Sequence, residues 1–342
     1  MGVKLKDLLP YKTVNFEELK GKYLAIDALN AIYQFLAIIR QPDGTPLMDH
    51  TGYVTSHLSG LFYRTINLLE SEVYPIYVFD GEPPLLKKET IEERREIREQ
   101  AREKWLHALQ IGAIEEARKY AQASMEVNEA IIKEAKALLE AMGVPYIQAP
   151  SEGEAQAAFI VQRGDAWSTA SQDFDSLLFG SPRLLRNLTL RGKRKLPGRQ
   201  EYKEINLELF NLDEALKSLD ITREQLVDIA ILVGTDFNKG IKGVGPKKGY
   251  QLIKKYKTVD KVFKALNIPK EEIPPYEEIR KIFLEPNVIS DYTIRFLDPN
   301  PQKIKEILCE MHDFSVERVE KAINRLSSLK TKGQQTSLEG WF

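Results

Sequence analysis

Acidic residues that directly follow short apolar runs are the clearest candidates for chemistry in this sequence. Each run has the length of a buried strand, and a parallel sheet brings the carboxyl ends of its strands to one edge. The acids concerned are Asp27, Asp80, Asp173 and Asp175 after strand-like runs, Glu152 and Glu154 in Ala149-Pro-Ser-Glu-Gly-Glu-Ala155, and Asp236 after an apolar helix. We therefore expect these carboxylates to converge on one pocket.

So many carboxylates in one pocket cannot all stay ionised without cations, because neighbouring like charges raise each other's pKa. Mg²⁺ suits mixed carboxylate and water ligands, and the sequence shows no His or Cys cluster that would favour zinc. Two such ions about 4 Å apart are the recurring device for phosphodiester hydrolysis. The pattern indicates a phosphodiesterase with two Mg²⁺ ions per active site, for which Mn²⁺ can substitute.

Each acid also has an ordinary structural interpretation. An aspartate after a strand often forms a turn or caps a helix. Ser151-x-x-Glu154 fits a capping box, and Asp173-Phe-Asp175 fits a turn. The structural interpretation must hold at every position at once, which weakens it.

The elements that position these acids alternate between strands and helices. We predict strands at Tyr23–Ile26, Val73–Phe79, Val144–Ile147 and Trp167–Ala170, and helices at Asn128–Met142, Glu154–Gln162 and Leu226–Val233. This alternation predicts an α/β fold with a mostly parallel central sheet flanked by helices. From about residue 206 onward we predict helices, and from Lys330 a polar, disordered tail.

Composition narrows the class of protein and its partners. The apolar runs are too short to cross a bilayer, no signal peptide is evident, and the single Cys309 permits no internal disulfide. We therefore expect a cytoplasmic protein in an archaeal-type cell, or a nuclear one in a eukaryote, without membrane contact. Net charge is −1, yet 183–203 and 239–261 each hold eight basic residues against one acid. Such segments bind phosphate or form solvated faces.

Two other segments combine dense charge with helix formers or glycines. Lys87–Ala108 interleaves acidic and basic residues at three- and four-residue spacing, which predicts a projecting, solvent-exposed helix. Gly240-Ile-Lys-Gly-Val-Gly-Pro-Lys-Lys-Gly249 precedes an amphipathic helix at Tyr250–Tyr256. Its glycines would let the backbone approach phosphate, and Lys247 and Lys248 would add charge at the helix start. A purely structural turn is the alternative.

The motifs also occur in a known order. Asp27-Ala-Leu-Asn-Ala-Ile-Tyr33, Val78-Phe-Asp-Gly-Glu-Pro-Pro84, Ala149-Pro-Ser-Glu-Gly-Glu-Ala155, Ala170-Ser-Gln-Asp-Phe-Asp175 and Gly234-Thr-Asp-Phe237 closely resemble those of flap endonucleases of the structure-specific 5′-nuclease superfamily. The resemblance covers essentially the whole chain. It implies that the metal ligands are Asp27, Asp80, Glu152, Glu154, Asp173, Asp175 and Asp236.

The same resemblance assigns roles outside the carboxylate set. It makes the projecting helix an arch over the active site, from which Lys87 and Arg94 reach the scissile phosphate; a solvated helix face is the alternative. Tyr33 resembles a tyrosine on which a base stacks, although a core position is the commoner role, and Gly2 resembles an N-terminal glycine near the site. The helix-two-turn-helix that holds duplex DNA, often with K⁺, is matched by Gly243, Gly245, Lys247 and Lys248.

The C-terminal segment fits the box that binds sliding clamps. Gln335-Thr-Ser-Leu338-Glu-Gly-Trp341-Phe342 has the pattern Q-x-x-[aliphatic]-x-x-[aromatic]-[aromatic]. Gln335, Leu338, Trp341 and Phe342 are therefore expected to bind a PCNA-type clamp; a frayed terminus is the alternative. The chain stops on this box without the basic extension of eukaryotic relatives, as in the archaeal type.

These features predict a monomeric, Mg²⁺-dependent 5′-flap endonuclease with 5′-3′ exonuclease activity, which acts in Okazaki fragment maturation and base excision repair. The expected regions are 1–98 and 116–258 for the nuclease, 99–115 within an arch of about 85–127, 259–329 for C-terminal helices and 330–342 for the clamp-binding tail. A catalytically silent scaffold is disfavoured by the intact carboxylates. An RNA-directed nuclease is disfavoured by the clamp box and the glycine-lysine segment.

Overall fold

A seven-stranded sheet forms the centre of the protein, whose computed structural model describes residues 2–41, 45–188, 192–195 and 202–338. The strand order is β1-β9-β6-β5-β2-β3-β4. The strands of this sheet are β1 (Lys12–Val14), β2 (Tyr23–Asp27), β3 (Tyr74–Phe79), β4 (Tyr146–Gln148), β5 (Ser168–Ala170), β6 (Arg183–Arg186) and β9 (Leu207–Asn211). A separate antiparallel pair consists of β7 (Gly192–Lys195) and β8 (Tyr202–Ile205).

The strands from β6 to β4 are parallel, which confirms the mostly parallel sheet predicted from the sequence. At the opposite edge, β9 pairs antiparallel with both β6 and β1. The register places Ile26 opposite Ala170, Asp27 opposite Val78, and Phe79 opposite Gln148. The carboxyl ends of four neighbouring parallel strands therefore lie together at one edge.

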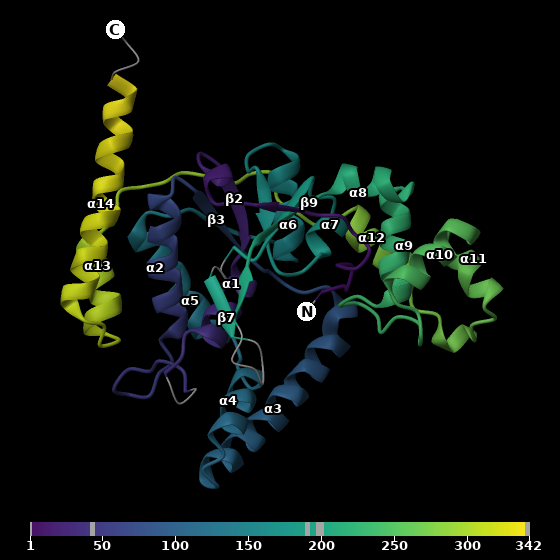
Figure 1. Ribbon diagram of the computed structural model, residues 1–342, viewed down its shortest axis with the longest axis horizontal. Coiled ribbons are helices and arrows are strands. Elements are labelled where there is room, and N and C mark those ends of the chain that lie inside the picture. Colours follow the sequence, from purple (N-terminus) through teal and green to yellow (C-terminus); the bar gives the residue numbers. More distant parts are fainter. Residues whose placement is uncertain (1, 42–44, 189–191, 196–201, 339–342) are drawn as a thin grey trace.

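Helices cover both faces of the sheet (Figure 1). The α-helices are α1 (Ala28–Ile38), α2 (Ser56–Glu70), α3 (Lys88–Gln110), α4 (Ile114–Ala123), α5 (Glu129–Met142), α6 (Gly153–Gln162), α7 (Asp175–Leu178), α8 (Leu212–Leu219), α9 (Arg223–Val233), α10 (Pro246–Tyr256), α11 (Val259–Ala265), α12 (Tyr276–Leu284), α13 (Pro301–Lys305) and α14 (Val316–Leu338). Short 3₁₀ turns are η1 (Glu17–Leu19), η2 (Leu85–Lys87) and η3 (Lys270–Glu272), and η4 (Glu306–Glu310) is a π-helical turn.

The alternation of side chains along β2 separates two layers of core. Leu24 and Ile26 pack into a core built largely from α1, α2, α5, α13 and α14. Ala25 faces the other way and packs with Val78 and with Ala157 of α6. Because both faces are covered, the strand is apolar throughout and ends at the polar edge with Asp27.

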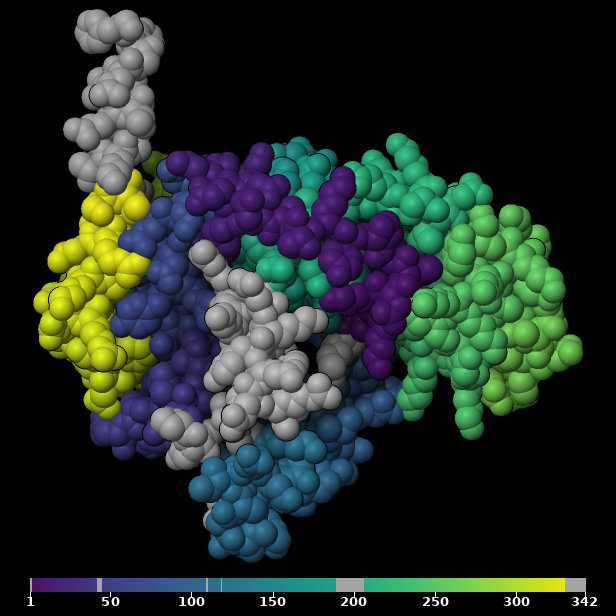
Figure 2. Space-filling model, in the orientation of Figure 1, coloured from purple at the N-terminus to yellow at the C-terminus, as the bar shows by residue number. Residues whose placement is uncertain are grey.

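Helices α3 and α4 form an arm that projects from this body, as the charge pattern of the arch segment predicts (Figure 1). Space-filling Figure 2 shows this arm at the lower border, with α10 and α11 in green at one end of the molecule and α14 in yellow at the other. Among the described residues, no helix combines the length and apolar character that a membrane span needs.

Three expected boundaries are wrong. Residues from 206 onward do not begin with a helix, because Leu207–Asn211 form β9 through long-range pairing with β1 and β6. Helix α10 begins at Pro246, one turn earlier than expected, since proline suits the first helical position after the N-cap Gly245. Helix α14 continues past Lys330 to Leu338, because extending an existing helix avoids the cost of nucleation.

Candidate active site

The predicted acids converge at the carboxyl edge of the parallel strands. Asp27 ends β2, Asp80 follows β3, Asp173 and Asp175 follow β5, Glu152 and Glu154 lie at the start of α6, and Asp236 follows α9. Each carboxylate interacts electrostatically with at least one other of the set. They form one group, which we call the carboxylate cluster.

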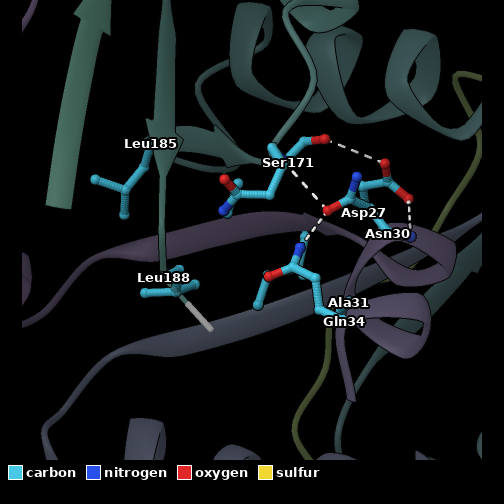
Figure 3. Close-up of a pocket in the computed structure, with 10 residues that line it drawn as sticks. Asp27, Asn30, Ala31, Gln34, Ser171, Leu185 and Leu188 are labelled. Carbon is cyan, nitrogen blue, oxygen red and sulfur yellow. Dashed lines mark hydrogen bonds between the residues drawn. The ribbon is translucent and has the colours of Figure 1, made fainter. Parts of the chain in front are cut away.

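Asp27 is held at the end of β2 by hydrogen bonds from Asn30 and Ser171 (Figure 3). Its Oδ1 accepts from the Asn30 backbone N–H at 3.0 Å, so Asp27 caps α1, as its structural interpretation predicts. Its Oδ2 accepts from the Ser171 hydroxyl at 3.2 Å. The Asn30 amide donates to Asp173 Oδ2 at 3.2 Å. Asn30 and Ser171 therefore orient two acids, a role that the sequence reasoning missed although both lie inside the motifs.

Glu154 does not form the expected capping box. No side chain caps α6, and the Ser151 hydroxyl donates instead to the Glu82 carbonyl at 3.0 Å. Oε1 of Glu154 is buried and has no hydrogen-bond partner among the described residues. Burial and the charge of Asp175 raise the pKa of Glu154 well above its usual range. A buried carboxylate oxygen without a donor is available to a cation.

Burial and mutual repulsion raise pKa values across the cluster. Burial, with Asp80 nearby, raises the pKa of Asp27 to about 8. Burial, with Asp236 nearby, raises the pKa of Asp175 to about 7. Burial also raises the pKa of Glu152. The cluster therefore resists full ionisation near neutral pH unless cations are added.

Two cations from the base of the arch reach the cluster. Lys87 Nζ lies 2.5 Å from Glu152 Oε2 and 3.7 Å from Asp236 Oδ2. Arg94 donates to Asp236 Oδ1 at 2.5 Å. Burial lowers the pKa of Lys87, but the charges of Glu152 and Asp80 outweigh it and the pKa is raised overall. A solvated helix face therefore does not describe Lys87 or Arg94.

Glycines allow the backbone to approach the acids closely. The Val3 N–H donates to Asp175 Oδ1 at 2.9 Å, and a Cβ on Gly2 would lie 2.6 Å from the same oxygen. A Cβ on Gly153 would lie 2.7 Å from Asp80 Oδ1, which accepts the Gly153 N–H. The structure thus places Gly2 beside the cluster, where a side chain would displace a carboxylate.

The donor set fits a hard divalent cation such as Mg²⁺. All of its members are carboxylates, and Glu154 offers an oxygen without a partner. Within the part of the chain that the structure describes, no three His, Cys, Asp or Glu side chains lie in an arrangement that could already hold a metal ion. Bare carboxylates repel one another, and Mg²⁺ typically keeps several waters while binding one or two carboxylates directly. The residues therefore fit the ion without a preformed cage.

Comparison with known proteins identifies the family. The XPG N-terminal domain matches residues 1–101, and the XPG I-region matches residues 143–236. Flap endonuclease 1 of Staphylothermus marinus is 55% identical over the full length of both chains. Flap endonuclease 1 of Pyrococcus furiosus is 54% identical over 100% of this chain and 99% of its own. The chain belongs to the flap endonuclease family.

Solved structures support this flap endonuclease fold. Flap endonuclease-1 from Methanococcus jannaschii is 42% identical and superposes with a TM-score of 0.76, covering 97% of this chain and 100% of that chain. The catalytic core of Rad2 in complex with DNA substrate shares the fold, with a TM-score of 0.68 at 24% identity over 92% of this chain and 96% of that chain. The likeness thus extends well beyond the carboxylate cluster.

Tyr33 of this flap endonuclease is not a core residue. Its ring is only partly buried, and its hydroxyl accepts from Arg98 of the arch at 2.9 Å. The Arg98 guanidinium also lies over the ring, 5.5 Å from its centre. Tyr33 thus joins α1 to α3 at the entrance of the arch. Its stacking on a base remains a prediction.

The glycine-lysine segment of the flap endonuclease leads directly into α10. Gly243 has φ of +77°, which favours glycine, and Gly245 forms the N-cap of the helix. Lys247 and Lys248 lie exposed in the first turn, and Lys248 Nζ donates to the Gly243 carbonyl at 3.3 Å. The helix start is exposed and positively charged, and its contact with phosphate remains a prediction.

The basic segment 183–203 differs in part from expectation. Arg183 donates to the Trp167 carbonyl at 2.6 Å, and Arg186 lies over the Phe174 ring and pairs with Glu208 at 3.2 Å. These arginines support the sheet instead of presenting a free phosphate-binding surface. Arg191 and Arg199 lie outside the described residues.

The clamp box falls only partly within the structure. Gln335 and Leu338 belong to the backbone of α14, whereas Trp341 and Phe342 lie outside the described residues. Clamp binding therefore remains a prediction from the sequence pattern.

Proposed function

We propose that this protein hydrolyses a DNA phosphodiester at the base of a 5′ flap and also acts as a 5′-3′ exonuclease. The observation that carries the proposal is the buried carboxylate cluster, two of whose acids pair with Lys87 and Arg94. An excess of buried carboxylates attracts metal ions, and the positive side chains of the arch attract phosphate. This combination suits a reaction that adds negative charge at phosphorus.

The cluster would hold two Mg²⁺ ions, or Mn²⁺, through Asp27, Asp80, Glu152, Glu154, Asp173, Asp175 and Asp236. When bound, such ions supply an activated water and neutralise charge on the attacking and leaving oxygens. Asn30 and Ser171 orient Asp27 and Asp173 for this purpose. Lys87 and Arg94, which pair with Glu152 and Asp236, would donate to the phosphate oxygens instead.

Recognition of the flap would depend on backbone contacts and on the arch. Gly243, Gly245, Lys247 and Lys248 would hold the phosphates of the duplex, with K⁺ at the same turn. Such contacts position DNA without reading its sequence. Tyr33, held against Arg98 in the free protein, would stack on a base near the cut.

The C-terminal box would recruit the enzyme to a PCNA-type sliding clamp. Leu338 and Trp341 are three residues apart, so one helical turn would place Leu338, Trp341 and Phe342 on one apolar face, with Gln335 one turn before them. Such recruitment suits Okazaki fragment maturation and base excision repair. Truncation after residue 334 should abolish clamp binding while leaving clamp-free cleavage unchanged.

A cleavage assay tests the main proposal. Purified protein with Mg²⁺ is incubated with 5′-labelled flap DNA, with the matched RNA flap and with linear duplex DNA. We expect cutting of the DNA flap near its junction, much slower cutting of the RNA, and no cutting in EDTA. Equal cutting of all substrates would contradict flap recognition, and cutting in EDTA would contradict the metal requirement.

A further inference from the structure

The loop between α9 and α10 passes the end of the arch helix α3 (Figure 1). Side chains of both signs of charge in this loop contact the helix. Asp236 of the loop lies 2.5 Å from Arg94 of the helix. Lys239 of the same loop lies 2.9 Å from Glu89 and 2.6 Å from Glu93. An acid of the loop therefore meets a cation of α3, and a cation of the loop meets two acids of α3.

The two contacts hold α3 from different sides. Glu89 and Glu93 are one turn apart on one stripe, whereas Arg94 follows Glu93 by about 100° around the helix axis. A rotation or tilt of α3 that kept one contact would strain the other. The pair of contacts therefore fixes the direction in which Arg94 leaves the helix.

The loop itself is a firm support. The Asn238 amide donates to the Ile231 carbonyl at 2.8 Å, and the Thr235 N–H donates to the Asn238 carbonyl at 3.0 Å. Gly240 has φ of +70°, and a Cβ there would collide with the backbone of Val233. The closely packed loop thus fixes the spacing between its acid and its lysine.

We propose that Lys239 is a positioning residue that clamps the base of α3 through Glu89 and Glu93 and so keeps Arg94 at the carboxylate cluster. This inference rests on the proposed function, because Arg94 matters to the rate only if phosphate is cleaved there. The side chains of Lys239, Glu89 and Glu93 are exposed, and single exposed ion pairs are weak and screened by salt. The expected effect is therefore moderate and salt-dependent.

The test combines a charge reversal with its rescue. The variants are Lys239→Glu, the triple variant Lys239→Glu with Glu89→Lys and Glu93→Lys, and the control Lys321→Glu. Lys321 is also exposed and lies 2.7 Å from Glu317, but on α14 at the other end of the molecule. Each is measured for single-turnover flap cleavage at saturating enzyme, for flap-DNA affinity, and for amide hydrogen exchange in residues 88–94 without DNA.

Lys239→Glu should slow cleavage about fivefold at low salt, change DNA affinity less, and speed exchange at the start of α3. The triple variant should recover most of both losses, and Lys321→Glu should match the wild type. If Lys239→Glu had the cleavage rate and the hydrogen-exchange rate of the wild type, the positioning role of Lys239 would be overturned. A triple variant that recovered neither rate would overturn it as well. If the wild type failed to cut flap DNA, the proposed function would fail, while the exchange measurement would still test the contact between Lys239 and α3.

Discussion

Two buried polar groups of this protein differ in the balance of their charges. The carboxylate cluster gathers acids at the sheet edge, where two of them pair with Lys87 and Arg94 from the arch. A second group, which we call the histidine cluster, lies where α2 and α5 meet the C-terminal helices. Its members are Asp49, Tyr53, His57, Glu134 and His312.

The histidine cluster places its acids beside imidazoles, and one of these contacts, between His312 and Asp49, is a hydrogen bond. His312 Nδ1 lies 2.9 Å from Asp49 Oδ2, and His312 Nε2 lies 3.3 Å from Glu134 Oε1. His57 Nε2 lies 3.6 Å from Glu134 Oε2, and the Tyr53 ring stacks on His312 with centroids 5.2 Å apart. These contacts join the segment before α2 to the segment before α14, so they hold the C-terminal helices in place.

The pKa directions are opposite in the two groups. Hydrogen bonds from Thr51 and His312 lower the pKa of Asp49. Burial tends to raise the pKa of Glu134, but the neighbouring His57 and Tyr53 lower it overall. In the carboxylate cluster, burial and repulsion raise the pKa of Asp27 and Asp175. An acid whose partners in the chain outweigh the effect of burial on its pKa serves the fold. Acids for which burial and mutual repulsion prevail require cations from solution.

The largest expected effect separates chemistry from binding. Asp175→Asn or Asp236→Asn should reduce flap cleavage about a thousandfold, because metal-assisted chemistry contributes several kcal/mol. Flap-DNA affinity should stay within several-fold, since binding is spread over many phosphate contacts. Asp213→Asn, at an exposed position of α8, is the control. Wild-type rates in the first two variants would remove these acids from the mechanism.

The arch cations should have the next largest effect. Lys87→Ala or Arg94→Ala should slow single-turnover cleavage at least about tenfold, because their charge stabilises the transition state. Affinity for flap DNA should fall less than the rate. Arg95→Ala, one residue away and paired with Glu99 on the exposed side, is the control. A variant that lost affinity alone would make the residue a substrate-binding group.

A break in the histidine cluster should affect stability without affecting chemistry. Glu134→Gln or His312→Ala should lower Tm by several degrees. The first removes the negative charge beside His57 and His312, and the second leaves the buried Asp49 without its imidazole partner. Flap cleavage at moderate temperature should be unchanged. His50→Ala removes an exposed histidine–aspartate pair nearby and should leave Tm almost unchanged. Loss of cleavage at full stability would show that the histidine cluster takes part in catalysis.

The response of stability to pH should distinguish the two clusters more finely. The folded-state pKa of Asp27 is about 8 and that of Asp175 about 7, above the usual carboxyl value near 4. The folded protein therefore binds more protons than the unfolded chain between about pH 4 and pH 8. The free energy of unfolding should fall as pH rises through that range, because these bound protons are lost from the folded state.

Calorimetry checks this expectation. Between pH 5.5 and pH 8, the Tm of the metal-free wild type should fall by a few degrees more than the Tm of Asp27→Asn. Mg²⁺ should raise the Tm of the wild type more at pH 8 than at pH 5.5. Glu134→Gln should keep the Mg²⁺ response. An identical pH dependence of Tm in the wild type and in Asp27→Asn would mean that burial and repulsion at Asp27 do not lower the stability of the folded protein.

The sequence predicts the acids that follow strands well, because strand topology fixes their place in the carboxylate cluster. An acid that ends a parallel strand must lie at the carboxyl edge, whatever loops follow it. Asn30 and Ser171 were missed, because polar residues after a strand are common and their partners lie 143 and 144 residues away. The fold class was predicted for the same reason, from the alternation of strands and helices.

Features that depend on contacts between distant segments were not predicted. Asp49 and His312 are separated by 263 residues, and neither stands in a recognisable motif. Strand β9 was expected to be helical, since its pairing with β1 and β6 is also long-range. The basic run predicts a phosphate-binding or solvated surface for Arg186, because a sequence does not show that a guanidinium stacks on Phe174.

The most direct test of the contrast between the two clusters is the location of Mn²⁺ in a soaked crystal, read from anomalous diffraction. We expect Mn²⁺ peaks among the carboxylates that include Asp27, Glu154 and Asp175, and none between His57 and His312. Absence of Mn²⁺ from the carboxylate cluster, or stronger density in the histidine cluster, would contradict this contrast.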